Sequence, residues 1–269
     1  MSASASAKNP IVFIHGLWLH AESWKNWIDF FRQNGYETTA ASWPGDSDTT
    51  KSTRDKPEAV AGYGVSEIAD YIVRQVKSLN QKPILIGHSF GGLLAQNLLG
   101  RDLAAAAVAI DPAPIKGVPE LPLSALKSSL PVLGNPFNFN RAISLTESQF
   151  RFGFTNAVSD EEAKELYVKY AMPAPARPLF QAATATFNPK AATKVNVENS
   201  KRGPLLLIAG SADNTVPPVL VKSALRVHRK SSAVTDYKEF PNRGHSLVID
   251  SGWRELAEHI LNWLHSKGF

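Results

Sequence analysis

Residues 84–92 read ILIGHSFGG, and the rest of the chain is organised around this stretch. Three branched apolar residues predict a buried strand, and the following LLAQNLLG has apolar residues at helical spacing. Between them, Ser89 has Gly87 and Gly91 two positions away on either side. A serine on so sharp a turn needs neighbours without a Cβ, because side chains there would collide with the flanking elements. The stretch therefore predicts strand, tight turn and helix, with the Ser89 hydroxyl exposed at the N-terminus of the helix.

The composition of the 269 residues is that of a globular protein with one large domain, or a domain with an insertion. The hydrophobic share of 43% is enough to build a sizeable core. The net charge of +5 is spread along the chain, with Lys and Arg never in runs longer than a pair. Nucleic acid is therefore not a predicted partner. Because the chain has no cysteine, disulfides, thiolate metal sites and cysteine nucleophiles are excluded.

The start of the chain, MSASASAKNP, lacks the apolar core of a secretory signal and is expected to be a short disordered tail. No apolar run is long enough to span a bilayer. We therefore expect a cytoplasmic protein without a membrane span. The oligomeric state has no signature in the sequence.

Strand and helix patterns alternate along most of the chain, which predicts an α/β fold. The sheet is expected to be doubly wound and mostly parallel, with about six strands. A polar stretch over residues 46–63, with Pro57 and Gly62, is expected to be a loop. Besides the strand and helix at Ser89, strands are expected at 10–15, 36–43, 104–110, 205–209 and 235–240, and helices at 22–33, 65–79, 218–228 and 252–266.

Residues 112–203 interrupt this alternation and divide the chain into a body, residues 1–111 and 204–269, and an insertion. The insertion is rich in proline and phenylalanine, and Thr146-x-x-Gln149 and Ser159-x-x-Glu162 have the spacing of helix capping boxes. An insertion at the carboxyl edge of a parallel sheet lies above the place where ligands bind. We therefore predict a helical lid with an apolar substrate pocket. The alternative is that its aromatic residues only pack the insertion onto the body.

A serine hydroxyl is a weak nucleophile and needs a base within hydrogen-bond reach. His245 is the predicted base, because it lies in a glycine-bearing loop after the last strand, at the sheet edge where Ser89 lies. His88 is next to the serine, and the turn is expected to point it elsewhere. His228 falls in a predicted helix, on a face expected to be solvated.

The third group of such a site is an acid that orients the base, and it follows a strand between the serine and the histidine. Asp213 has this position, after the apolar strand that ends at Ala209. Asp111 is the alternative, because it also ends a strand. Otherwise, Asp111 caps the turn that it forms with Pro112.

The oxyanion hole requires two backbone N–H donors directed at the developing negative charge. Phe90, the residue after the nucleophile, is predicted to supply one, and Leu17, after the first strand, the other. Gly16 would let this loop approach Ser89 closely. Trp18 is a candidate substrate-binding residue; it either lines the pocket or packs the loop.

Taken together, His15-Gly16, Gly87-His88-Ser89-Phe90-Gly91-Gly92, Asp213 and Gly244-His245 resemble the α/β-hydrolase superfamily. The resemblance is closest to its lid-bearing esterase, lipase and haloperoxidase-like branch with a serine nucleophile. Many members begin with an antiparallel hairpin that this chain has no room for, so a shortened sheet is implied. The loop often written Asp-x-Pro-Gly-x-Gly is here Ser42-Trp43-Pro44-Gly45-Asp46-Ser47, which puts its usual contacts in doubt.

These residues predict a serine hydrolase of carboxylic esters with an apolar acyl or aryl part. The alternatives keep the triad and change the reaction to C–C bond hydrolysis, acyl transfer or perhydrolysis, or make the protein a ligand receptor on a hydrolase fold. No metal and no cofactor are expected, because dinucleotide and phosphate-loop patterns and paired histidines are absent. The expected partner is a small apolar ester or a related molecule.

Overall fold

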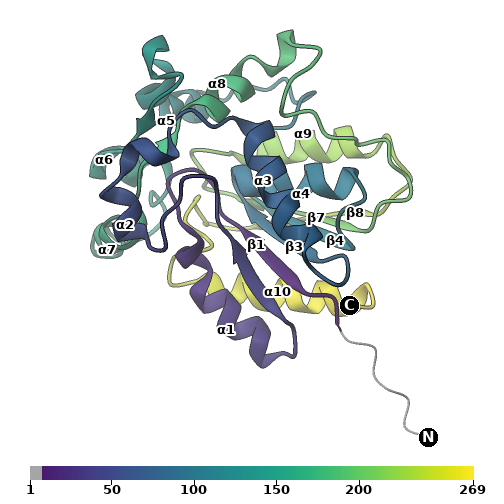
Figure 1. Cartoon of the computed structure of the whole chain (residues 1–269). Coiled ribbons are helices and arrows are strands. Elements are labelled where there is room, and N and C mark those ends of the chain that lie inside the picture. Colours follow the sequence, from purple (N-terminus) through teal and green to yellow (C-terminus); the bar gives the residue numbers. More distant parts are fainter. Residues whose placement is uncertain (1–7) are drawn as a thin grey trace, which may run out of the picture.

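A computed structural model describes residues 8–269, which form a six-stranded sheet between two layers of helices (Figure 1). All neighbouring strands are parallel, in the order β2-β1-β3-β4-β7-β8. The prediction of a mostly parallel sheet of about six strands is confirmed. The strands are β1 (Ile11–Ile14), β2 (Thr38–Ala41), β3 (Ile84–His88), β4 (Ala106–Ile110), β7 (Leu205–Gly210) and β8 (Thr235–Phe240). The N-terminal stretch predicted to be a disordered tail lies outside the described residues, apart from its last three.

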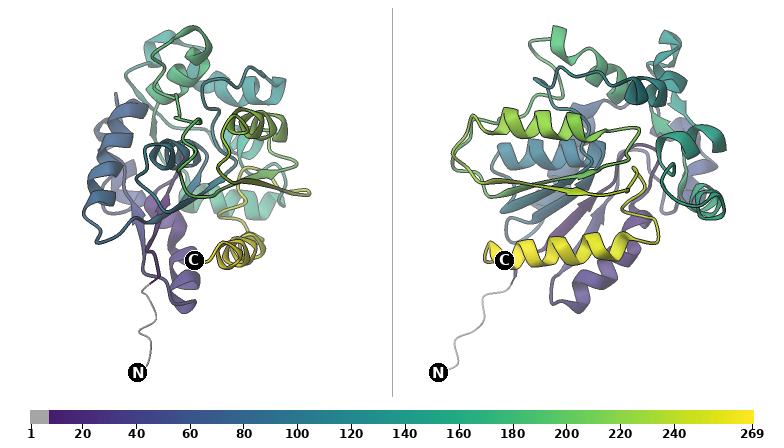
Figure 2. Two further views of the ribbon diagram at one scale, coloured as in Figure 1. Left: turned by 90° about the vertical axis from the view of Figure 1, so that its right-hand side faces the viewer. Right: turned by 180° about the vertical axis from the view of Figure 1, so that it is seen from behind.

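The inner strands β1, β3, β4 and β7 are buried along their whole length, because helices cover both faces of the sheet. Figure 1 and Figure 2 show α1 (Lys25–Gln33) and α10 (Trp253–Ser266) on one face. The other face is covered by α3 (Val65–Lys77), α4 (Phe90–Gly100) and α9 (Pro218–His228). Within the described residues, no helix combines the length and the apolarity that crossing a membrane requires.

The chain reverses its direction across the sheet between β1 and β3, which are hydrogen-bonded neighbours. Open parallel sheets bind ligands outside the carboxyl ends of their strands at such a reversal. The loop after β1 and the turn after β3 therefore meet where a ligand site is expected.

The loop expected over residues 46–63 is in part helical, and this prediction was wrong. It contains α2 (Thr50–Arg54) and the 3-10 helix η2 (Pro57–Val60). The Thr49 hydroxyl accepts a hydrogen bond from the Ser52 N–H at 3.0 Å, and the Ser52 hydroxyl accepts one from the Thr49 N–H at 3.0 Å. Serine in place of the usual Glu or Gln makes this capping box hard to recognise in the sequence.

Between β4 and β7 the chain forms a helical insertion at the carboxyl edge of the sheet (Figure 1). Two of its helices begin where the sequence predicts, because Thr146 caps α6 and Ser159 caps α7. A short antiparallel strand pair was not expected from the sequence. The elements are α5 (Leu123–Leu133), 3-10 helix η3 (Pro136–Asn138), β5 (Ala142–Ile143), α6 (Glu147–Gly153), α7 (Asp160–Tyr170), β6 (Ala174–Pro175), α8 (Arg177–Ala183) and 3-10 helix η4 (Ala185–Phe187), and the body also has 3-10 helix η1 (Ala21–Trp24).

Candidate active site

Ser89 joins β3 to α4 in a left-handed backbone conformation, with φ 55° and ψ −122°. An added Cβ on Gly87 would lie 2.1 Å from the Gly91 carbonyl oxygen, and one on Gly91 would lie 2.1 Å from that of Ile14. Neither position therefore accepts a side chain. A serine with positive φ is strained, and the flanking strand and helix hold it in place. The turn is the one that the sequence predicts around Ser89.

His245 and Asp213 come from the loops after β8 and β7 and meet at the carboxyl edge of the sheet. The His245 Nδ1 lies 2.6 Å from the Asp213 Oδ2, and both side chains are buried. The other carboxylate oxygen of Asp213 accepts hydrogen bonds from the N–H groups of Thr215, at 2.6 Å, and Val216, at 2.8 Å. Such bonds fix the position of a buried carboxylate. Asp213 is therefore arranged to orient the imidazole.

The second nitrogen of His245, Nε2, is buried and has no hydrogen-bond partner among the described residues. Because Nδ1 is bonded to Asp213, Nε2 is the atom left to accept a proton. Within residues 8–269, Ser89 Oγ makes no hydrogen bond to it. Such bonds are often long before substrate binds. The structure thus brings His245 and Asp213 into contact, and it brings Ser89 to the same sheet edge.

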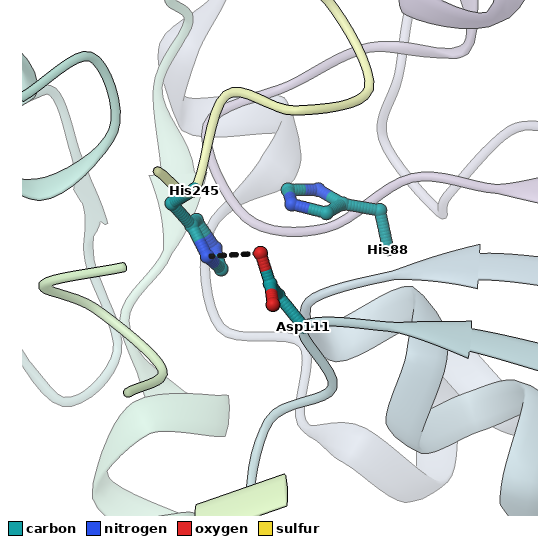
Figure 3. Close-up of side chains that lie close together, drawn as sticks. All are labelled: His88, Asp111 and His245. Carbon is teal, nitrogen blue, oxygen red and sulfur yellow. Dashed lines mark ion pairs between the residues drawn. The ribbon is translucent and has the colours of Figure 1, made fainter. Parts of the chain in front are cut away.

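Asp111, the alternative acid, is also close to His245 (Figure 3). Its Oδ2 lies 4.0 Å from the His245 Nδ1, beyond hydrogen-bond distance, and its Oδ1 accepts a hydrogen bond from the Gly210 N–H at 2.7 Å. Burial and the neighbouring Asp213 carboxylate raise the pKa of Asp111 well above its ordinary value. Asp111 is therefore held as a neutral carboxylic acid, and the shorter distance to His245 favours Asp213 as the orienting group.

His88 does not point away from the site, because its ring packs against that of His245 with the centroids 4.5 Å apart. Burial, and next the neighbouring imidazole of His245, lower the pKa of His88 well below its ordinary value, so its ring is neutral. Within the described residues, His88, Asp111 and His245 are the group that could hold a metal ion, since their ligand atoms lie within 4.8 Å of one another. A metal on either nitrogen of His245 would remove one of the two contacts that a general base needs.

The loop after β1 lies directly against the Ser89 turn. A Cβ on Gly16 would lie 2.6 Å from the Ser89 Cβ and 2.9 Å from the His88 carbonyl oxygen. Leu17 and Phe90 are both buried. Within residues 8–269, neither of their N–H groups donates to a backbone or side-chain acceptor. Two free N–H groups beside a serine are what an oxyanion hole requires.

Asp46, which the sequence analysis did not assign to the site, fixes this loop from the side. Its Oδ2 lies 3.1 Å from the His15 Nε2 and accepts a hydrogen bond from the Trp43 N–H at 2.7 Å. The His15 ring also stacks on the Trp43 indole, with the centroids 4.8 Å apart. The unusual loop of residues 42–47 therefore still binds the loop after β1, through its own aspartate.

Trp18 both lines the cavity and fixes the loop, so the two alternatives for this residue apply together. Its φ is 63°, and its Nε1 donates to the Ile143 carbonyl oxygen at 3.0 Å. The Met172 N–H donates to the Trp18 carbonyl oxygen at 3.1 Å. Both partners belong to the insertion. Trp18 therefore connects the insertion to the residue next to Leu17.

Phe154, which the sequence analysis grouped with the other insertion phenylalanines, lies between Trp18 and His245. Its ring packs edge-on against both, with centroid distances of 6.0 Å to Trp18 and 4.8 Å to His245. The Ser246 N–H donates to the Phe154 carbonyl oxygen at 2.9 Å. Periodicity alone does not distinguish such a residue from a core aromatic.

A cavity of about 260 Å³ opens from Ser89 into the insertion. Its lining is mostly apolar, as expected for a site that binds an apolar group. The insertion supplies most of the lining side chains, among them Ile115, Leu126, Leu133, Leu179, Ala182 and Phe187.

His228 was expected on a solvated face, and this prediction was wrong. The side chain is 1% exposed, and its Nε2 lies 2.9 Å from the Gln96 Oε1 on α4. Burial and the nearby positive charge of Arg202 lower the pKa of His228 to about 3. The glutamine lies 132 residues away in the chain, so local periodicity gave no indication of this contact.

The sequence of residues 11–259 matches the model of a family described as "Alpha/beta hydrolase family". Several solved structures are similar over nearly the whole chain. A monoacylglycerol lipase from Paleococcus ferrophilus is 23% identical, with a TM-score of 0.67, and the match covers 97% of this chain and 96% of that one. An extracellular alpha/beta-hydrolase from a Paenibacillus species is 22% identical, with a TM-score of 0.68, over 95% and 98% of the two chains.

A methylesterase, MES16, from Arabidopsis is 16% identical, with a TM-score of 0.65, over 96% and 99% of the two chains. Among curated proteins, (E)-2-((N-methylformamido)methylene)succinate hydrolase from Acinetobacter baylyi is 29% identical over 86 residues. That match spans 32% of this chain and 30% of the length of the relative. The family match covers the whole sheet and the site built on it, and the chain therefore belongs to the alpha/beta hydrolase family and is a hydrolase.

Proposed function

We propose that the protein is a serine hydrolase that cleaves a carboxylic ester with an apolar acyl or aryl part. The observation that carries this proposal is the buried contact of 2.6 Å between His245 and Asp213, which leaves the His245 Nε2 free at the sheet edge where Ser89 is held. A histidine that acts as general base next to a nucleophile has one ring nitrogen bonded to an acid and the other nitrogen free.

In the proposed reaction, the Ser89 Oγ attacks the ester carbonyl carbon while the His245 Nε2 takes the hydroxyl proton. Asp213 stabilises the resulting imidazolium. The N–H groups of Leu17 and Phe90 bind the oxyanion of the tetrahedral intermediate. His245 then gives its proton to the leaving alcohol, and the acyl group remains on Ser89. Water, deprotonated by His245, releases the carboxylic acid and restores the serine.

We further propose that residues 112–203 form a lid over this site. The apolar lining of the cavity favours an apolar acyl or aryl group, because a charged group would lose its hydration there. An ester substrate agrees with the names of two proteins of the same fold, a monoacylglycerol lipase and a methylesterase. A cytoplasmic location stays a prediction of the sequence.

The test is hydrolysis of p-nitrophenyl esters of increasing chain length by the wild type and by Ser89→Ala. We expect activity in the wild type and none above background in the variant. Ser266→Ala is the matched control, because this exposed serine is on α10 and lies outside the site. Equal activity in wild type and Ser89→Ala would refute the assignment of Ser89. Product analysis with natural esters, acyl acceptors and peroxide would separate hydrolysis from acyl transfer and perhydrolysis.

A further inference from the structure

The outer side of the insertion exposes large apolar side chains next to the opening of the cavity. The most exposed are Leu121 at 72%, Leu123 at 84%, Phe137 at 80% and Phe187 at 88%, and Leu130 is 60% exposed. Contiguous exposed apolar residues mark interaction sites more often than scattered ones do. We call these five residues and Leu126 the outer apolar surface.

The spacing of the leucines on α5 and the shared lining of one cavity relate these residues to one another. Leu123, Leu126 and Leu130 are three and four positions apart, and so lie on one side of α5. Leu121, Leu126 and Phe187 all line the same cavity, which brings η4 next to α5. Phe137 lies in η3, which begins three residues after the end of α5. Three of the six residues therefore line the cavity that contains Ser89, and the other three continue from them along α5 and into η3.

The two segments that carry the outer apolar surface have an excess of positive charge, and the neighbouring Glu120 is paired with Arg226. Residues 121–146 and 171–197, which contain this surface, include no Asp or Glu. Arg177 pairs with Glu67 of the body, at 3.1 Å. The other cations of the two segments are exposed: Lys127, Arg141, Lys190 and Lys194. Residues 147–170, the rest of the insertion, contain five acidic and three basic residues, Glu147, Asp160, Glu161, Glu162 and Glu165 against Arg151, Lys164 and Lys169.

We propose that the outer apolar surface docks onto lipid aggregates that carry anionic headgroups. Leucine and phenylalanine side chains on a helical face enter the boundary between headgroups and acyl chains, and nearby lysines attract anionic lipid. A second copy of this chain fits less well, because the same four cations would then face each other. This inference goes beyond the proposed ester hydrolysis. It also places the cavity opening against the lipid, so an apolar ligand could enter without crossing water.

The test is sedimentation of the full chain with vesicles of three parts phosphatidylcholine to one part phosphatidylglycerol, and with pure phosphatidylcholine vesicles. We expect binding to the anionic vesicles, and a loss of at least about tenfold in Leu123→Ser/Leu130→Ser/Phe137→Ser. The matched control is Val168→Ser/Val234→Ser, which removes two exposed apolar side chains elsewhere, 62% and 49% exposed. We expect this control to bind as the wild type does.

A charge variant separates the two parts of the interaction. Lys127→Gln/Lys190→Gln should weaken binding to the anionic vesicles, and added salt should weaken binding by the wild type more than by this variant. None of Leu123, Leu130 and Phe137 lines the cavity. Hydrolysis of a soluble short-chain ester and the melting temperature are therefore expected to be unchanged in the triple variant.

Three outcomes would overturn the proposal. The wild type could bind no vesicles, it could bind both compositions equally, or the control variant could lose as much binding as the triple variant. A concentration-dependent dimer in ultracentrifugation that disappears in the triple variant would assign the surface to a second copy instead. A chain that binds vesicles but hydrolyses no ester would refute the proposed function and leave this inference standing.

Discussion

The body and the insertion differ in how they use buried and exposed groups. The body buries polar side chains, and it holds Ser89, Asp213 and His245 on loops at the ends of parallel strands. The insertion exposes large apolar side chains and supplies most of the cavity lining. A reaction needs fixed geometry, which a closed hydrogen-bond network gives, whereas selection of an apolar group needs mainly shape and area. We therefore expect body substitutions to change the rate for every substrate, and insertion substitutions to change which substrates react.

Many contacts join the two regions, and three of them reach the candidate site. Trp18 of the body bonds to Ile143 and Met172 of the insertion, and Ser246 bonds to Phe154. These contacts link the loop after β1 and the loop that carries His245 to the position of the insertion. Substitutions at these residues should therefore change both the rate of the reaction and the choice of substrate.

The largest effect is expected for Ser89→Ala, which should lower kcat by about 10⁶ for esters of every chain length, since no nucleophile remains. Steady-state kinetics with short and long p-nitrophenyl esters measures this. A loss confined to long esters would mean that Ser89 acts in selection, and the comparison of the two regions would be wrong.

Asp213→Asn and Asp111→Asn compare the two buried carboxyl groups. Asp213→Asn should lower kcat by about 10⁴, because the amide cannot hold the imidazole in the right tautomer. Asp111→Asn should cost less than about tenfold, because Asp111 is already neutral and an amide replaces it with little change in shape. The reverse order in kcat would make Asp111 the orienting acid.

The buried His228 of the body should make the stability of the protein depend on pH. The folded state keeps His228 neutral, whereas the unfolded chain protonates it below its ordinary value of 6.5. The contribution of neutral His228 to the free energy of unfolding is therefore at its maximum above about pH 6.5. It is lost as the pH falls towards 3, by up to about 1.4 kcal/mol per pH unit.

Urea unfolding of the wild type and of His228→Gln between pH 4.5 and 6.5 measures this dependence. The variant should lose less stability per pH unit, because the unfolded chain then gains one proton fewer. His265→Gln, at an exposed position of α10, is the control and should follow the wild type. Parallel curves for His228→Gln and the wild type would show that His228 is protonated in the folded protein.

Ala182→Phe adds a ring to the cavity wall at a position that belongs to the insertion. We expect kcat/KM to fall about 10- to 200-fold for the longest esters, because the acyl chain loses its space, and to change little for the acetate. The acetate is thus the control within the same variant. An equal loss for both esters would mean that the insertion also supports the chemistry through Ala182.

The smallest effect is expected for Trp18→Phe, which keeps a ring and removes the indole N–H that bonds to the Ile143 carbonyl oxygen. The loss of one hydrogen bond should lower kcat about three- to tenfold. The value of KM should change little, because the ring that lines the cavity remains. A higher KM at constant kcat would show that Trp18 only lines the cavity, and that it does not transmit the position of the insertion.

The sheet and the Ser89 turn could be predicted because their signals are local. A glycine on each side of Ser89 and uniform apolar strands follow from steric and burial rules that apply to short stretches. The boundaries of α9 and β8 match the predicted 218–228 and 235–240 for the same reason. The candidate residues Ser89, His245 and Asp213 were placed by the rule that carboxyl ends of parallel strands share one edge.

What the sequence could not predict depends on contacts between distant segments. His228 pairs with Gln96, and Asp46 pairs with His15, and neither pairing has a local pattern. Whether Asp111 or Asp213 orients His245 depends on about 1.4 Å, the difference between 4.0 Å and 2.6 Å, at the ends of adjacent strands. The cavity depends on how α5, α8 and η4 pack, which proline content and capping boxes do not determine.

The most direct test of the central claim is the intact mass of the protein after reaction with a fluorophosphonate, followed by peptide mapping. This reagent reports a serine that a neighbouring base activates. We predict one adduct per chain, located on Ser89, absent in Ser89→Ala and formed more slowly in Asp213→Asn. A folded wild type that gains no adduct, or gains it on another residue, would contradict the assignment of Ser89 as the nucleophile.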